Sequence, residues 1–344
     1  MKRQRVWGMN AHLVMYLLVP LLVLALSPFI FQIVNRAAFR QRPDQVVVRE
    51  PGMRTLGPPT DAAREAREDL EFAMLSEAAY QRTADAKKVQ AGEAIDVDKM
   101  LHDMKWVRWE DFPQDKPAKN LRTMIEQKHL RLEVWSNAST NKVAVTFGGT
   151  VGRNINDWKS DLRWFIHDRN DEYTVIVRDF GGAFVEEYKR REQLPDFAFL
   201  RGAQLFSTGH SLGGGLAHQF AYALPPDLSV PRVKKVYAFD PSPVTGFYSV
   251  DEKLRQDNSE LLKIDRIYER GEILAFFRAL VNLVYPPTES KPAIRQVRYS
   301  LFYSWNPFAN HSMADLAFGL DKVCNCRGVA RAPEVGPETG DRRD

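Results

Sequence analysis

The sequence predicts an α/β fold with a mostly parallel central sheet flanked by helices, preceded by one N-terminal transmembrane helix. Short β-rich runs alternate with helical stretches along the chain, which is typical of α/β domains. At residues 203–224 a strand, a glycine-rich turn and a helix follow one another. The run Leu13–Val34 differs from all of these because it carries no charge over 22 residues. At about 1.5 Å per residue it would span about 33 Å, enough for a hydrocarbon core of about 30 Å.

The composition is that of a globular protein with a sizeable core. The chain has 344 residues, of which 44% are hydrophobic and 27% charged. Its net charge of +4 is uneven, since the first 54 residues carry +6 and the remaining 290 carry −2. The body therefore offers no broad basic face, which argues against a nucleic-acid partner. Two cysteines, Cys324 and Cys326, are too few for a disulfide framework or a four-cysteine zinc site.

The N-terminal residues 1–42 are interpreted as a basic segment with an uncleaved, single-pass membrane anchor. A cleavable signal peptide is the alternative, because Ala25-Leu26-Ser27 has small residues at a suitable spacing. The apolar run nevertheless continues beyond Pro28. Basic residues on both sides of the run leave open which side of the membrane the body occupies.

The rest of the chain divides into a linker, a folded domain and a tail. Residues 43–60 are rich in proline, glycine and charge and predict a linker, residues 61–325 a single domain, and residues 326–344 a polar, disordered tail. Residues 81–128 show no clear element. The predicted elements of the domain are a helix over Asp61–Tyr80, a hairpin of Leu130–Trp135 with Val143–Phe147, strands at Val233–Phe239, Ile264–Tyr268 and Ile294–Tyr303, and a helix from near Ser312.

The turn Gly209-His210-Ser211-Leu212-Gly213 has the pattern of a nucleophile elbow. It lies between the apolar run Ala203–Phe206 and the helical stretch Leu216–Leu224. In such an elbow a strained turn lifts the serine hydroxyl above the sheet, so residues without side chains are required two positions on either side. A serine that only caps a helix would explain the same glycines. The placement between strand and helix favours Ser211 as a catalytic nucleophile.

Two segments are candidates for the stabilisation of an oxyanion. The run Val143–Phe147 ends in Gly148-Gly149-Thr150, where backbone N–H groups can approach a ligand closely. Acyl transfer needs one donor from the residue after the nucleophile, here Leu212, and one from a loop after an earlier strand. Thr150 fits the second role, although a plain glycine turn remains an alternative.

A catalytic serine also needs a base and an acid. Of the histidines after Ser211, His218 lies seven residues along the elbow's own helix, whereas His311 lies in a loop between a strand and a helix. We therefore predict His311 as the base. Asp240 and Glu272 each follow a predicted strand, and either can orient an imidazole. Glu272 is preferred because it closes the later strand in a tight loop, and Asp240 is kept as the alternative acid.

These segments together resemble the class 3 (fungal-type) lipase family of α/β hydrolases over about residues 65–322. The segments that carry the resemblance are Phe147–Thr150, Asn156-Asp157-Trp158 with Asp161-Leu162, Gly209–Gly214, and the acid and histidine of the C-terminal third. The resemblance implies an α/β-hydrolase fold, Ser211 as nucleophile, Glu272 as acid and His311 as base. It also implies Thr150 and Leu212 as oxyanion donors, and lipid or other carboxylic esters as substrates.

The chain departs from the family pattern at two positions. Gly148 stands where the family usually has arginine, and Glu272 stands where aspartate is usual. The first departure concerns how the oxyanion loop is held, and the second adds one methylene of reach. Ile273–Tyr285 has apolar residues at helical spacing and is expected either to line an acyl pocket or to belong to the core.

The sequence thus predicts a membrane-anchored serine ester hydrolase of lipase or phospholipase type, which forms an acyl-enzyme and requires no metal or organic cofactor. Two alternatives remain open. An acyltransferase would use the same three residues, and a non-catalytic module of the same fold would bind lipid or a protein partner.

Overall fold

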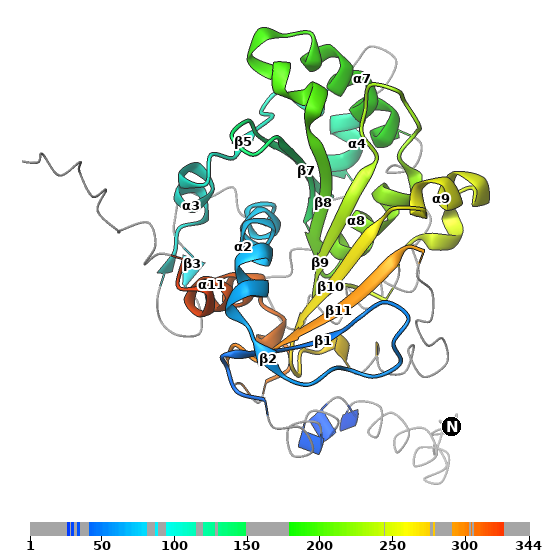
Figure 1. The fold of residues 1–344 in the computed structure, drawn as a ribbon. Coiled ribbons are helices and arrows are strands. Elements are labelled where there is room, and N and C mark those ends of the chain that lie inside the picture. Colours follow the sequence, from blue (N-terminus) through cyan, green and yellow to red (C-terminus); the bar gives the residue numbers. More distant parts are fainter. Residues whose placement is uncertain are drawn as a thin grey trace, which may run out of the picture.

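The computed structural model describes a central sheet with helices on both faces (Figure 1). It describes residues 41–80, 87–88, 94–114, 120–127, 130–148, 179–243, 245–275, 278, 291–302, 304 and 306–326, together with residues 26, 27, 29, 30, 33 and 34. The strands are β1 (Gln45–Arg49), β2 (Thr60–Asp61), β3 (Lys87–Lys88), β4 (Ala94–Ile95), β5 (Val107–Arg108), β6 (Arg131–Asn137), β7 (Lys142–Gly148), β8 (Gln204–His210), β9 (Val233–Phe239), β10 (Lys263–Glu269) and β11 (Ala293–Tyr299). The α-helices are α2 (Ala63–Ala78), α3 (Val97–Asp103), α4 (Leu121–Gln127), α7 (Gly181–Glu192), α8 (Leu212–Ala223), α9 (Glu252–Ser259) and α11 (Met313–Cys324). Short 3₁₀ helices are η2 (Pro195–Gly202), η3 (Phe247–Ser249) and η4 (Ala309–His311).

The main sheet has the strand order β2-β1-β11-β10-β9-β8-β7-β6-β5 among the described residues. The five strands from β7 to β11 are parallel to one another, whereas β6 pairs with β7 and β1 with β11 in antiparallel fashion. The prediction of a mostly parallel sheet therefore holds for the five central strands, and the antiparallel pair of β6 and β7 is the predicted hairpin. All parallel strands end at the same edge, and ligands of open α/β sheets bind outside that carboxyl edge.

Helices cover both faces of the sheet and enclose two apolar cores. On one face α2, α3 and α11 contribute Phe72, Leu101 and Leu316 to the first core. On the other face α4, α7 and α8 contribute Ile125, Phe184 and Phe220 to the second core. The central parallel strands are thus covered by helices on both sides, and β7 in particular is apolar at consecutive positions from Val143 to Val145.

Most of the predicted elements are confirmed. The predicted hairpin is formed by β6 and β7. The predicted strand Val233–Phe239 is β9, with the same bounds. The first helix is α2, and Ser312 caps α11 by accepting a hydrogen bond from the Asp315 N–H over 3.3 Å.

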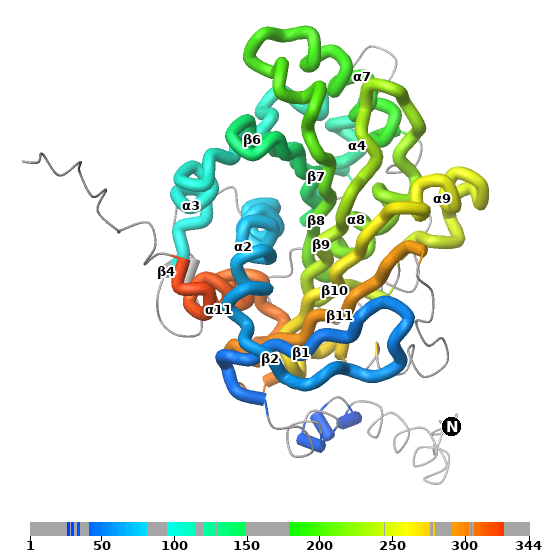
Figure 2. Tube along the Cα trace, viewed as in Figure 1, coloured from blue at the N-terminus to red at the C-terminus, as the bar shows by residue number. Residues whose placement is uncertain are grey.

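The predicted linker over residues 43–60 is wrong for its first part, which forms β1. In Figure 2 this strand lies alongside β11 at the edge of the sheet, and Val47 is paired with Arg298. The strand forms because three consecutive valines, residues 46–48, have high β propensity and bury one edge of the sheet. The run was missed because the composition of residues 43–60 as a whole is dominated by charged and turn-forming residues.

The predicted anchor and tail lie mostly outside the described residues. In the part of the chain that the structure describes, no helix is both long and apolar enough to cross a bilayer. The tail from residue 327 onward is likewise outside. At the end of α11, Cys324 and Cys326 are joined by a disulfide bond.

Candidate active site

Ser211 occupies a strained turn between β8 and α8. Its backbone has φ 56° and ψ −121°, a conformation that non-glycine residues rarely adopt. The turn is held from β9, because the Ser211 N–H donates to the Phe239 carbonyl over 2.9 Å. In the other direction, the Ser242 N–H donates to the Ser211 carbonyl over 2.9 Å. The Ser211 side chain is half-buried at the carboxyl edge of the sheet.

The glycines two residues on either side of Ser211 are required by packing. A Cβ at Gly209 would lie 2.6 Å from the Phe147 carbonyl oxygen and would overlap the Gly213 backbone. A Cβ at Gly213 would overlap the same Phe147 carbonyl. The elbow therefore packs directly against the end of β7, and the pattern of glycines in the sequence has a steric cause.

Glu272 and His311 lie in contact, although 39 residues separate them in the chain. The Nδ1 atom of His311 is 2.8 Å from Oε2 of Glu272, and both side chains are buried. Glu272 follows β10 after a turn in which Gly271 has φ 79°, and His311 ends η4. Asn310 ties the two loops together by donating to the Gly271 carbonyl over 3.2 Å.

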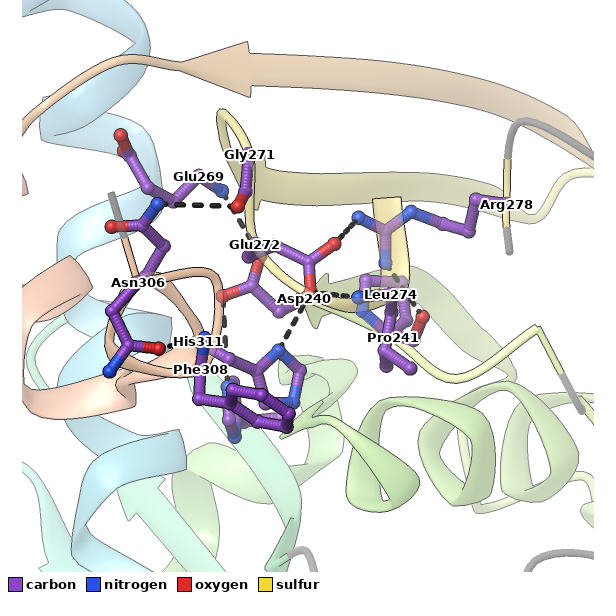
Figure 3. A network of polar contacts seen from close by, with 12 residues as sticks. Asp240, Pro241, Glu269, Gly271, Glu272, Leu274, Arg278, Asn306, Phe308 and His311 are labelled. Carbon is purple, nitrogen blue, oxygen red and sulfur yellow. Dashed lines mark hydrogen bonds and ion pairs between the residues drawn. The ribbon is translucent and has the colours of Figure 1, made fainter. Parts of the chain in front are cut away.

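The surroundings of Glu272 favour its ionised form. Figure 3 shows Glu272 between Arg278 and His311, with an ion pair to Arg278 on its Oε1 side. The Leu274 N–H also donates to Oε2 over 2.7 Å. Burial alone would raise the pKa of Glu272, but the Arg278 charge and the His311 hydrogen bond outweigh it, and the pKa is lowered. An ionised carboxylate can accept hydrogen bonds but cannot donate them. In the contact with Glu272, His311 is therefore the donor through Nδ1–H, and its lone pair is on Nε2.

Asp240, the alternative acid, faces a different histidine. It follows β9 with φ 39°, and its Oδ1 accepts the Glu269 N–H over 3.0 Å. Its Oδ2 lies 3.7 Å from Nε2 of His210. Burial and the negative charge of Glu272 raise the pKa of Asp240 well above its usual value, so the neutral form is favoured. Of the two candidate acids, Glu272 is the one in hydrogen-bond contact with His311.

His210 links the elbow to His311. Its ring centre lies 4.7 Å from that of His311, and its Nδ1 is 2.8 Å from the Tyr80 hydroxyl oxygen. Because His210 directly precedes Ser211, this contact brings Ser211, Glu272 and His311 to one edge of the sheet. Sequence reasoning missed the partners Tyr80 and Arg278. Tyr80 is 130 residues from His210, and Arg278 lies within a stretch selected for its apolar residues.

The remaining predicted positions fall outside this site or outside the described residues. His218 is buried in α8 with Nδ1 2.6 Å from the Gly214 carbonyl oxygen, and burial lowers its pKa to about 3. Asp265, within β10, pairs with Lys235 at 2.6 Å. Leu212 is the first residue of α8. Thr150, the Asn156–Leu162 segment and most of Ile273–Tyr285 lie outside the described residues.

Comparison with known proteins finds similarity at the level of solved structures. Lipase II from Rhizopus niveus matches with a TM-score of 0.36 and 14% identity, over 65% of this chain and 74% of that chain. The lipase from Rhizopus microsporus var. chinensis matches with a TM-score of 0.41 and 13% identity, over 74% and 87%. The propeptide complex of Rhizomucor miehei lipase matches with a TM-score of 0.37 and 13% identity, over 82% and 86%. No protein-family model matches the chain, and no curated protein does so.

Proposed function

We propose that the chain is a serine hydrolase of carboxylic esters, with Ser211 as nucleophile, His311 as general base and Glu272 as the acid that orients the base. The observation that carries this proposal is the 2.8 Å contact of Glu272 with His311, whose ring centre lies 4.7 Å from that of His210, the residue before the strained Ser211. A base held by a carboxylate next to such a serine is the arrangement used for acyl transfer.

The proposed reaction follows from the proton positions in this arrangement. Ser211 Oγ attacks the ester carbonyl while His311 Nε2 takes its proton, and Glu272 stabilises the imidazolium through Nδ1–H. The same proton passes to the leaving alcohol, which leaves an acyl-enzyme. Water then attacks the acyl group with His311 again as base, and Ser211 is restored. A neutral Asp240 adds no second negative charge beside Glu272, so the imidazolium is stabilised by one carboxylate.

The backbone at the elbow supports electrostatic stabilisation of the reaction intermediate. The Leu212 N–H lies at the first position of α8, where the helix dipole favours negative charge. Leu212 is therefore proposed as one oxyanion donor and Thr150 as the other. Lipid esters are the proposed substrate class, and a lipase or phospholipase the proposed type of enzyme.

Attachment to a membrane through residues 13–34 is part of the same proposal. Ile30, Ile33 and Val34 are between 52% and 58% exposed, which argues against a helix buried in the core. An anchor would keep the enzyme next to an insoluble substrate and raise the effective concentration of one for the other.

Labelling by a fluorescent fluorophosphonate tests the proposal. The detergent-solubilised full chain is expected to be labelled, and Ser211→Ala is expected to lose labelling and to hydrolyse esters about 10⁴-fold more slowly or worse. Ser242→Ala is the control, because Ser242 contacts the elbow through its backbone N–H. It is expected to retain labelling.

The same experiment separates the alternatives. Folded wild-type protein that takes up no label would favour a non-catalytic binding module. Labelling accompanied by turnover that depends on an added acyl acceptor other than water would favour an acyltransferase.

A further inference from the structure

Three ligating side chains from separate elements meet beside the proposed base. They are His210 at the end of β8, Asp240 after β9 and His311 in η4, and all three are buried. One nitrogen or oxygen atom of each lies within 4.8 Å of the others. Two imidazoles and a carboxylate are a ligand set that suits zinc, with a fourth position open to water.

Both histidines are oriented from Nδ1, the ring nitrogen that would not bind the metal. Glu272 is hydrogen-bonded to Nδ1 of His311 at 2.8 Å, and the Tyr80 hydroxyl is hydrogen-bonded to Nδ1 of His210 at 2.8 Å. Metal-binding histidines almost always have such an oxygen partner on the other nitrogen, which fixes the ring and leaves Nε2 as the ligand atom. The cluster therefore has an outer layer of contacts as well as three ligands.

Asp240 has an oxygen atom to which a metal cation can bind in place of a proton. Its Oδ1 accepts the Glu269 N–H, whereas its Oδ2 accepts no hydrogen bond from any residue that the structure describes. Asp240 is completely buried. A buried polar atom normally has a partner, since its desolvation is otherwise not compensated. The backbone of Asp240 has a φ of 39°, a strained conformation of the kind that clusters at functional sites.

The distances are compatible with zinc after small side-chain movements. Zinc bonds of about 2.0–2.1 Å in a tetrahedral site place ligand atoms about 3.4 Å apart. His210 Nε2 and Asp240 Oδ2 are already 3.7 Å apart. The widest pair, within 4.8 Å, has to close by at most about 1.4 Å. Mg²⁺ and Ca²⁺ prefer oxygen ligands, so two imidazoles select against them.

We propose that His210, Asp240 and His311 form an inhibitory zinc site, in which bound Zn²⁺ occupies the His311 Nε2 atom. Zinc binding is independent of the proposed function, whereas inhibition rests on it. With its lone pair on Nε2 bound to the metal, His311 cannot take the proton of Ser211, and the first step of hydrolysis stops. Zinc thus competes with the reaction for one nitrogen.

Direct titration with Zn²⁺ tests the site without any catalysis. The full chain with Ser211→Ala and no histidine tag is expected to bind one Zn²⁺ with a ligand set that includes His210. Adding His210→Asn is expected to abolish this binding, since asparagine can keep the contact with Tyr80 but has no atom at the Nε2 position. His102→Asn, at an exposed histidine on α3, is the matched control and is expected to bind as before. Binding unchanged by His210→Asn would overturn the proposal.

A second variant keeps the proposal testable if His210→Asn fails to fold. Tyr80→Phe retains the ring but removes the hydrogen bond to His210, and zinc binding is expected to weaken about 10–100-fold. Equal affinity in Tyr80→Phe and the parent chain would contradict the proposed orientation of His210.

Inhibition is measured separately, as ester hydrolysis by the wild-type chain with and without metal. Zn²⁺ is expected to inhibit at the concentration at which it binds, a chelator to reverse the effect, and Mg²⁺ to leave the rate unchanged. Zinc binding in a chain that hydrolyses no ester would support the site and overturn the proposed function. Hydrolysis in a chain that binds no zinc would support the proposed function and overturn the zinc site.

Discussion

Two clusters of buried and half-buried polar and charged residues lie on the same sheet and differ in their backbone conformation. The edge cluster consists of His210, Asp240, Glu272, Arg278 and His311, at the carboxyl ends of the strands. The α2 cluster consists of Glu65, Asp69, Lys235, Asp265 and Arg295, on α2 and within β9, β10 and β11. Around the edge cluster Ser211, Asp240 and Gly271 all have positive φ. The residues of the α2 cluster lie on regular helix and strand.

The partners of the carboxylates differ as well. In the α2 cluster Asp265 pairs with Lys235 and Arg295, and Asp69 accepts a hydrogen bond from the Tyr299 hydroxyl over 2.7 Å. In the edge cluster Glu272 also has an arginine, but its second oxygen holds an imidazole. Both clusters contain an aspartate with a raised pKa. A perturbed pKa therefore does not identify a catalytic site by itself, and the distinguishing feature of the edge cluster is an imidazole held by a carboxylate close to the strained backbone of Ser211.

The largest expected difference between the clusters is in turnover. Glu272→Gln is expected to lower kcat/KM for ester hydrolysis about 10⁴-fold, because a neutral amide cannot stabilise the imidazolium or fix its tautomer. Asp265→Asn is the matched change in the α2 cluster. It is expected to keep kcat/KM of the folded protein and to lower the free energy of unfolding by about 1–3 kcal/mol.

Measurement of both quantities for both variants tests this separation of catalysis from stability. Similar losses of kcat/KM in the two variants would mean that the edge cluster contributes no more to catalysis than the α2 cluster does. In that case the assignment of Glu272 would fail.

The second expected difference is in the pH dependence of stability. Burial and the nearby Asp265 charge raise the pKa of Asp69 from 3.8 to about 8 in the folded chain. Between these pH values the folded state keeps a proton that the unfolded state has released, so stability falls as pH rises from about 4 to about 8. Each pKa unit corresponds to about 1.4 kcal/mol, so the total is on the order of 5 kcal/mol.

Asp69→Asn removes this titration and still offers an oxygen to Tyr299. Urea unfolding at several pH values is expected to show a much smaller loss between pH 4 and 8 in this variant. Asp257→Asn, at an exposed position on α9, is expected to follow the wild type. A variant with the wild-type slope would show that Asp69 is ionised in the folded chain.

The sequence predicted the parts of the fold and site that have a local signal. β9 and the strained turn at Ser211 are predictable because their residues alone carry the pattern, and His311 and Glu272, which lie in contact, were selected by their order after predicted strands. β1 was missed because its three valines lie in a polar segment. The contacts of Tyr80 with His210 and of Arg278 with Glu272 were missed because neither has a spacing rule. Such contacts exist only once the sheet has brought distant segments together.

A third expected difference concerns the backbone of the elbow. Gly213→Ala would place a Cβ against the Phe147 carbonyl, so the elbow has to shift from β7. We expect a loss of about 1–3 kcal/mol in the free energy of unfolding, together with weaker labelling of Ser211. Thermal unfolding and fluorophosphonate labelling measure the two effects. Wild-type stability and wild-type labelling in this variant would mean that the elbow can accommodate a Cβ at residue 213, contrary to the close contact with Phe147.

The smallest expected effect comes from the same substitution at the equivalent position of another helix. Gly182 is the second residue of α7 and Gly213 the second residue of α8, and both helices have 12 residues. Nothing lies within 4 Å of a Cβ at Gly182. Gly182→Ala is therefore expected to raise the free energy of unfolding by about 0.4–1 kcal/mol, since alanine reduces the freedom of the unfolded chain. Opposite signs at the two glycines, measured by urea unfolding, would assign the loss at Gly213 to contact with Phe147. A loss at both would instead assign it to the first turn of the helix, and the steric account of the elbow would fail.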